Sequence, residues 1–475
     1  MQWLQRLVGL AILGTATLGA LVLWFAVAAA DPKRGHSPTE GVLFGIWRVF
    51  YDTELPSMRI LSAAAGMALL LAAGVAALER RLLTRARRSE DPDRMPLAPK
   101  VVMAETRGVY AGPVTITVLI PAHNEESCIS ETLDSLLSQS LPPARVVVVA
   151  DNCTDSTVRL AREAGVDVFE TRDNVHKKAG GLNQALLEVL PDLGDNDCVM
   201  VMDADTQLDP GFLAGATRRL TDDRALMAVG GLFYGEEGAG LIGQFQRNEY
   251  SRYQRELRRR RGRVFVLTGT ASVFRPRALR AVAEERSRNL PGVPGDVYDT
   301  VALTEDNELT MALKSLGALM ISPPECTVVT EVMPSWRSLW AQRLRWQRGA
   351  LENLGAYGLR PQTFRYWAQQ LGIGYGVIAL GSYLLLILLM VLATSSWVWF
   401  PFWIGIGLFF TVERVVTVWR GGTRARLLAL SLFPELFYAM FLNVIYIKGI
   451  WDLSLAKQAT WKHVVQTETG VRIKG

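Results

Sequence analysis

The stretch "VMVMDADTQ", residues 199–207, decides the fold, because four apolar residues run into two carboxylates, Asp203 and Asp205. A short apolar run bounded by polar residues is consistent with a fully buried strand. The two acids then stand where that strand leaves the hydrophobic core. We interpret the stretch as a core strand that ends at a polar crevice.

Strand and helix patterns alternate around this stretch. Strands are predicted in "VTITVLIP" (114–121), "RVVVVAD" (145–151) and "VDVFET" (166–171), and helices in "ISETLDSLLSQS" (129–140), "TDSTVRLAREAG" (154–165) and "KKAGGLNQALLEVL" (177–190). Such alternation predicts an α/β domain with a parallel sheet and helices on both faces. Ligands of these sheets bind outside the carboxyl ends of the strands. Asn124, Glu125, Asp151, Asp203 and Asp205 are expected at that edge.

Asp203 and Asp205 are the candidate metal ligands. Side chains two residues apart in an extended segment point the same way, so the two carboxylates can share one cation. Oxygen ligands favour Mg²⁺ or Mn²⁺, which keep positions for water and substrate phosphates. A solvated loop is the alternative for two acids in this pattern.

Two further candidates lie on neighbouring segments, each with a structural alternative. Asp151 is either a turn or cap carboxylate in "DNCTDST" or a hydrogen-bond partner of a nucleotide base or ribose. Lys178 in "HKKAGGLNQAL" is either a solvated lysine at a helix start or a residue that faces a diphosphate, with glycines that allow close backbone approach.

Two downstream motifs add the remaining candidates. In "LTEDNELTMALKSLG" (303–317), Glu305 and Asp306 precede a helical pattern, and they either favour the helix start or supply a general base, Asp306. In "SWRSLWAQRLRWQRG" (335–349), Gln342, Arg345 and Trp346 share one helical face. An interfacial anchor is the alternative, whereas arginine suits a diphosphate and an indole face suits a sugar or an acceptor.

Five apolar segments suggest that the protein is integral to a membrane: Val8–Ala30, Ile60–Leu78, Leu371–Thr394, Trp397–Trp419 and Leu427–Ile447. A cleaved signal peptide is the alternative for the first. Pro434 and Glu435 interrupt the last, which we expect to be partly interfacial or re-entrant. The basic stretch 79–88 places the central region in the cytoplasm. We therefore expect two N-terminal membrane helices in 1–79, a cytosolic domain in 80–365, a membrane region in 366–450 and a tail in 451–475.

Composition narrows the class of partner. The chain of 475 residues has a net charge of only +5, and it has no nucleic-acid-binding motif, so no nucleic-acid partner is expected. Its four cysteines form no CxxC pair, which argues against a zinc site.

Seven motifs in order carry a family resemblance: "PAHNEE", "VADNCTD", "KKAGGLNQAL", "DADT", "TGTASVFR", "TED" and "QRLRW". Over about Pro113–Gly349 the chain resembles the processive, membrane-integrated family 2 glycosyltransferases, which include cellulose, hyaluronan and poly-N-acetylglucosamine synthases. The resemblance implies a GT-A (Rossmann-like) fold, a UDP-sugar donor and an inverting reaction in the cytoplasmic domain of a plasma (bacterial inner) membrane protein.

Residue by residue, the resemblance implies the following roles. Asp151 would hold the nucleotide base and Lys178 would lie near the diphosphate. Asp203 and Asp205 would serve the donor and its metal, with Asp205 as the direct ligand, and Asp306, next to Glu305, would be the catalytic base. Gln342, Arg345 and Trp346 would hold the diphosphate and frame the acceptor, and Gly269 and Thr270 would fall in an acceptor-contacting loop.

The leading hypothesis is a polysaccharide synthase with UDP-N-acetylglucosamine as donor, which passes a β-linked chain outward through its membrane segments or an accessory subunit. The alternative is a non-processive enzyme that glycosylates a lipid. A third reading is an inactive nucleotide-binding scaffold, which would be expected to lack Asp306 or Arg345, and both are present.

Overall fold

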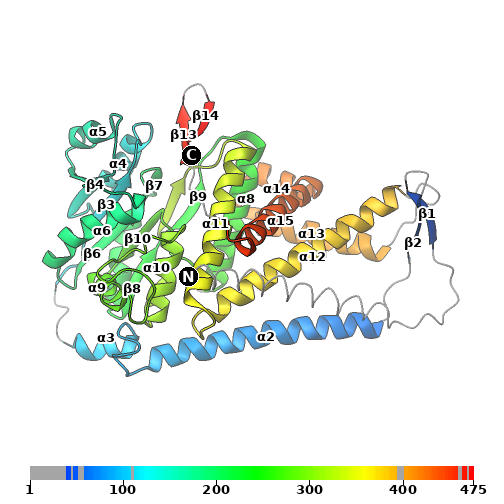
Figure 1. The fold of residues 1–475 in the computed structure, drawn as a ribbon, viewed down its shortest axis with the longest axis horizontal. Coiled ribbons are helices and arrows are strands. Elements are labelled where there is room, and N and C mark those ends of the chain that lie inside the picture. Colours follow the sequence, from blue (N-terminus) through cyan, green and yellow to red (C-terminus); the bar gives the residue numbers. More distant parts are fainter. Residues whose placement is uncertain are drawn as a thin grey trace. The chain divides into compact units, whose positions relative to one another are not determined.

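The computed structural model (Figure 1) describes residues 39–43, 47–51, 58–107, 112–260, 262–392, 401–457, 463–467 and 470–474. The chain divides into two compact units. One unit comprises Met1–Arg81 and Thr363–Gln458, and the other comprises Leu82–Gln362 and Ala459–Gly475. The predicted segment Val8–Ala30 lies outside the described residues.

The second unit is built on a mixed sheet. In the described part of the chain this sheet has seven strands in the order β11-β8-β10-β6-β3-β4-β5. Their bounds are β3 Thr115–Ala122, β4 Arg145–Ala150, β5 Asp167–Glu170, β6 Asp197–Met202, β8 Leu226–Gly230, β10 Ala271–Phe274 and β11 Leu319–Ile321. Figure 1 shows β3, β4 and β6 side by side.

Helices cover both faces of this sheet, as the sequence predicts. Val118 and Ile120 of β3 pack in one core cluster with side chains of α4 (Ile129–Leu137), α5 (Thr157–Glu163) and α7 (Phe212–Asp222). The opposite face receives α6 (Lys177–Val189), since Gly181 of α6 lies against Val149 of β4. Strands buried on both faces read as continuous apolar runs, which is why β4 and β6 are visible in the sequence.

The expectation of a parallel sheet is correct for β3, β4, β5 and β6 but wrong for β10. β3 pairs in parallel with β4 and β6, and β4 pairs in parallel with β5. β10 runs antiparallel between β6 and β8. Alternating patterns reveal the order of elements, whereas the direction of a four-residue strand depends on how the preceding segment returns to the sheet.

This unit has further elements. A smaller sheet has the order β7-β12-β9 among the described residues. The further bounds are α3 Pro99–Glu105, a 3₁₀ turn Leu190–Asp192, β7 Thr206–Leu208, β9 Leu232–Gly235, α8 Gly240–Arg259, α9 Pro276–Glu285, α10 Glu305–Ser315, β12 Thr327–Thr330, α11 Trp336–Tyr357, β13 His463–Thr467 and β14 Gly470–Lys474.

The described part of the first unit is mainly helical. Its elements are β1 Thr39–Leu43, β2 Trp47–Tyr51, α12 Phe364–Leu392, α13 Pro401–Thr417, a 3₁₀ turn Trp419–Gly421, α14 Gly422–Leu430 and α15 Phe433–Ser454, together with the first part of α2 Met58–Arg88. Within the residues that the structure describes, one helix, α15, is long and apolar enough to cross a membrane.

The last apolar segment differs from the predicted Leu427–Ile447. The chain breaks between α14 and α15, where Leu432 has a φ of 48°, and Pro434 stands in the first turn of α15. Proline lacks an N–H and is favoured at a helix start, which explains the break. The apolar helix therefore begins later than expected and continues to Ser454.

Candidate active site

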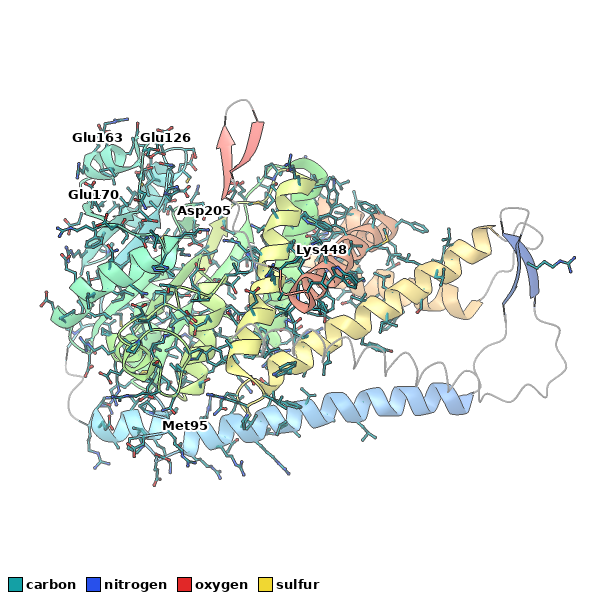
Figure 2. The ribbon with its side chains drawn as sticks, in the orientation of Figure 1. Met95, Glu126, Glu163, Glu170, Asp205 and Lys448 are labelled. Atoms are coloured by element: carbon teal, nitrogen blue, oxygen red, sulfur yellow. The ribbon has the colours of Figure 1, made fainter. Side chains whose placement is uncertain are left out.

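The candidate site lies at one edge of the parallel strands. β4 is followed by Asp151, and β6 is followed by Asp203 and Asp205, of which Asp205 is labelled in Figure 2. β3 lies between these strands and leads to Asn124, whose φ of 59° asparagine tolerates better than most residues. The carboxyl ends of neighbouring parallel strands open onto a crevice, so the fold brings these polar residues to one edge.

Lys178, in the first turn of α6, bridges acids from two other elements. Its Nζ lies 2.5 Å from Oδ1 of Asp203 and 3.0 Å from Oε1 of Glu305. Burial disfavours the charged lysine, but Asp203 and Glu305 outweigh it and raise the pKa of Lys178 well above its ordinary value. Lys178 therefore stays cationic and joins the end of β6 to the start of α10.

Asp306 follows Glu305 in the first turn of α10 and faces Gly269. The backbone N–H of Gly269 donates to Oδ2 of Asp306 at 3.2 Å. A Cβ on Gly269 would lie 3.0 Å from Lys178 Nζ and 3.1 Å from Asp203 Oδ2, so this position favours glycine. The neighbouring Thr270 accepts a hydrogen bond from the N–H of Asp203 through its carbonyl, at 3.3 Å.

The charge state of Asp306 follows from these surroundings. Burial, and then the charge of Glu305, raise the pKa of Asp306 to about 6, while Lys178 opposes the shift. The pKa of Glu305 is instead lowered, since the pull of Lys178 outweighs the effect of burial. Of the two adjacent acids, Asp306 is the better proton acceptor near neutral pH.

A small cavity connects these groups. Its polar lining includes Lys178, Tyr298, Glu305 and Asp306, and its apolar lining comes from Val201, Leu267, Phe274 and Leu309. Side chains from α6, β6, β10, α10 and the loop before β10 therefore converge on one space.

Asp205 is the second acid of the pair after β6. Burial, and then the charge of Asp203, raise the pKa of Asp205 to about 6. Its Oδ1 accepts a hydrogen bond from the Thr206 hydroxyl at 3.3 Å. A cation beside the pair would relieve the repulsion that raises this pKa.

The donor set fits a metal that takes few protein ligands. Among the described residues, no group of three or more His, Cys, Asp and Glu is arranged to hold a metal ion. Mg²⁺ and Mn²⁺ suit oxygen donors, and Mg²⁺ is commonly held by one or two carboxylates together with water and substrate phosphates. Asp205 and Asp203 match that requirement.

Asp151 lies at the same sheet edge but in a network of its own. It is buried, and its Oδ1 accepts hydrogen bonds from Thr171 Oγ1 at 2.8 Å, Asn174 Nδ2 at 2.8 Å and Asn152 Nδ2 at 3.1 Å. Asn174 Nδ2 also donates to the carbonyl of Lys177 at 2.7 Å. Asp151 thus orders the segment that leads into α6.

The three residues predicted to share a helical face all lie on α11, yet the arginines of "QRLRW" face different partners. Burial, and then the charge of Arg345, lower the pKa of Lys177, and Arg345 adds to the larger pull of Lys178 on the pKa of Glu305, so Arg345 is near the acids of the site. Arg343 instead stacks on Trp346, with its guanidinium carbon 4.2 Å from the ring centroid. Its Nη1 also donates to Oε1 of Gln342 at 3.1 Å.

Sequence reasoning missed two residues of this region, Arg343 and Lys177, and gave a third, Glu125, no role of its own. In the sequence, Arg343 is only one more basic residue within "QRLRW", and Lys177 is only the neighbour of Lys178. Glu125 was expected only at the sheet edge, but burial, followed by the charges of Asp205, Glu331 and Asp203, raises its pKa to about 7. The signal that could have found Glu125 is its position after β3, next to the strand that leads to Asp203.

Comparisons with known proteins find relatives for the middle of the chain. Residues 113–349 match the family described as "Glycosyltransferase like family 2". A poly-β-1,6-N-acetyl-D-glucosamine synthase of Staphylococcus aureus (strain COL) is 25% identical over 245 residues, which cover 50% of this chain and 55% of that protein. A probable glycosyltransferase, YdaM, of Bacillus subtilis (strain 168) is 29% identical over 247 residues, which cover 49% of this chain and 54% of that protein. The matches thus span little more than half the length of these relatives.

Among solved structures, a mannosyltransferase from Pyrobaculum calidifontis in complex with GDP-Man and Mn²⁺ aligns with 83% of this chain and 99% of its own. The sequence identity is 18% and the TM-score is 0.46.

Proposed function

Residues 113–349 form a domain of glycosyltransferase family 2, with the α/β, Rossmann-like architecture of a GT-A fold, and from this premise we propose that the protein is a membrane-embedded polysaccharide synthase. It transfers sugar from a UDP-sugar to a growing β-linked chain with inversion at the anomeric carbon. The named activity of the Staphylococcus aureus relative supports UDP-N-acetylglucosamine as the donor.

One observation carries the proposal: Asp306 lines one small cavity together with Lys178, whose Nζ bonds Asp203. Gly269 lies between these groups. Its N–H donates to Asp306, and its missing Cβ leaves room for Lys178 and Asp203. A base beside the donor's anomeric carbon is what a transfer to a hydroxyl requires.

The donor would be held by charge. Asp205 and Asp203 would bind Mg²⁺ or Mn²⁺, which when bound neutralises negative charge on the diphosphate. Arg345 and Lys177 lie close enough for their charges to interact, and two cations that repel each other would be stabilised by an anionic diphosphate between them. Asp151 would hold the nucleotide base.

The transfer would be a single displacement. Asp306 takes the proton of the acceptor hydroxyl as its oxygen bonds to the anomeric carbon, and the bond to the diphosphate breaks on the opposite face, so UDP leaves and the configuration inverts. A pKa of about 6 keeps most of Asp306 ionised at neutral pH while retaining useful basicity. Trp346 would frame the acceptor sugar.

The helical unit supports the membrane part of the proposal. Along α15, exposed apolar side chains recur at helical spacing, at Phe433, Phe437, Met440, Val444, Ile447 and Trp451. The interior side of α15 carries the buried Glu435, which pairs with Arg414 of α13 at 3.8 Å. An apolar outer stripe with a paired charge inside is the arrangement expected of a helix that faces lipid.

The test uses purified full-length protein in lipid nanodiscs with Mn²⁺ or Mg²⁺. UDP-N-acetylglucosamine, UDP-glucose and UDP-glucuronate are screened for UDP release and the products are sized, with Asp306→Asn as control. We expect long polymer that is lost in the variant. A single sugar added to lipid would replace the synthase with a lipid glycosyltransferase, and nucleotide binding without turnover of any donor would contradict the proposal.

A further inference from the structure

A buried ion pair lies on the helix that begins with Glu305 and Asp306. Arg286, just after α9, is 1% exposed, as is Glu308 of α10. Arg286 Nη1 lies 2.5 Å from Glu308 Oε1, and its Nη2 lies 2.8 Å from Oε2, so the pair is bidentate. Arg286 also donates to the carbonyls of Pro291 and Val297, at 2.7 and 2.5 Å.

α11 reaches the same carboxylate. The hydroxyl of Tyr357, a residue only 2% exposed, donates to Oε1 of Glu308 at 2.5 Å. Burial and the neighbouring Glu308 raise the pKa of Tyr357 well above its ordinary value, so the hydroxyl keeps its proton and remains a donor. One carboxylate thus receives three hydrogen bonds from two different elements.

A second tie joins α11 to the first residue before α10. Asn353 Nδ2 donates to the carbonyl of Thr304 at 3.1 Å and to its hydroxyl at 3.2 Å. One turn earlier, a Cβ on Gly349 would lie 2.5 Å from Thr304 Oγ1, so glycine allows this close approach. Gly349, Asn353 and Tyr357 are spaced by four and occupy one face of α11.

These contacts span the two helices that carry the proposed chemistry. α10 begins with Glu305 and Asp306. Glu308 follows two residues after Asp306, in the same helical turn. α11 carries Arg345 near its middle and ends at Tyr357. The distance between the base and the diphosphate-binding arginine therefore depends on how α10 is held against α11.

Stability alone explains this network poorly. Burying an ion pair costs desolvation, and well-packed apolar residues of similar volume are often equally stable or more so. A bidentate ion pair with a third hydrogen-bond donor instead holds the Glu308 carboxylate in a single geometry.

We propose that Tyr357, Glu308, Arg286 and Asn353 are positioning residues that hold the start of α10 so that Asp306 faces the acceptor hydroxyl and the donor together. None of them lines the cavity beside Asp306. The inference rests on the proposed function, because it assigns Asp306 as the base.

The main variant is Tyr357→Phe, which keeps the ring and leaves Arg286 on Glu308, so the protein is expected to fold. Full-length enzyme in nanodiscs is assayed with the donor that supports turnover. We expect kcat to fall about tenfold with the donor KM unchanged, because a small misplacement of a reacting group is costly. Tyr234→Phe is the matched control, since it likewise removes one hydrogen bond between elements, the one that Arg258 of α8 donates to the Tyr234 hydroxyl of β9.

Two further variants test the positioning. Glu308→Gln keeps a side-chain oxygen that accepts hydrogen bonds, so the protein is expected to fold, but it removes the charge that holds the bidentate pair, so kcat is expected to fall as much as in Tyr357→Phe. Asn353→Ala combined with Tyr357→Phe is expected to lower kcat by less than the product of the single effects, since both release the same helix start.

Amide hydrogen exchange measures how firmly the start of α10 is held, and it does not require turnover. We expect faster exchange in peptides that cover residues 303–310 of Tyr357→Phe, with exchange around Tyr234 unchanged. Unchanged kcat in Tyr357→Phe, or unchanged exchange at 303–310, would overturn the inference and leave the proposed function intact. If wild type turns over no donor, the proposed function fails and the exchange data still decide whether the network holds α10.

Discussion

Arg343 and Glu249 form an ion pair at 3.0 Å between α11 and α8, and the same guanidinium stacks on Trp346. The Arg343 side chain is 6% exposed and that of Glu249 is 33% exposed, so the guanidinium is shielded from water while the carboxylate is not. Arg343 therefore supports the Trp346 ring, while the charge of Arg345 acts on the acids of the site. The two arginines of one short motif therefore serve different partners.

This division predicts different defects for the two arginines. We expect Arg345→Lys to weaken UDP binding about tenfold, because a point charge replaces a bidentate fork, whereas Arg343→Lys leaves UDP binding unchanged and lowers turnover. Calorimetry with UDP and Mn²⁺, run beside the nanodisc assay, checks both. Equal loss of UDP affinity in the two variants would contradict the division.

Activity should fall as the pH drops through about 6. The base must be ionised to accept a proton, and burial together with Glu305 raises the pKa of Asp306 to about 6. Below that pH the protonated fraction grows and kcat is expected to fall tenfold per pH unit. A pH–rate profile between 4.5 and 8.5 measures this limb, under conditions where the protein stays folded.

Glu125 provides the control for that profile, because its pKa is raised to about 7, chiefly by burial. In Glu125→Gln the acid limb should stay near pH 6 if Asp306 is the base. Disappearance of the limb in this variant would assign it to Glu125 instead.

Gly269→Ala should impair catalysis more than stability. The new Cβ would lie 3.0 Å from Lys178 Nζ, and since Nζ is the end of a flexible side chain, the lysine can retreat at the expense of its bond to Asp203. We expect kcat to fall by at least tenfold with a melting temperature close to that of wild type. Gly376→Ala, whose Cβ meets no atom within 4 Å, is the matched control. An active Gly269→Ala enzyme would mean that Lys178 and Asp203 need not approach each other.

Chelation should abolish turnover, and Mn²⁺ or Mg²⁺ should restore it. Asp203 is already paired with Lys178, so Asp205 is expected to be the main protein ligand. In Asp205→Asn, the rise in melting temperature produced by UDP with Mn²⁺ should vanish, while Asp203→Asn keeps part of it. Retained thermal stabilisation by Mn²⁺ in Asp205→Asn would argue against a site at these acids.

The strands that lead into the site were predictable because their signals are local. β3, β4 and β6 are apolar runs, since both faces of the sheet are covered, and each leads to a polar residue at the same edge. β10 has only four residues and was not predicted, and its antiparallel direction depends on pairing with β6 and β8. The break before α15 was anticipated from Pro434, which stands in the first turn of that helix.

The sequence by itself determined which residue types reach the edge of the sheet, because strand and helix periods follow from backbone geometry and burial. It determined the acids after β6, the acids at the start of α10 and the common face of Gln342, Arg345 and Trp346. Only the tertiary structure decided that Lys178 joins Asp203 to Glu305, that Arg343 rather than Arg345 supports Trp346, and that Tyr357 binds Glu308. Each of these contacts joins residues from different elements or depends on where neighbouring elements pack, and local periodicity carries no information about that packing.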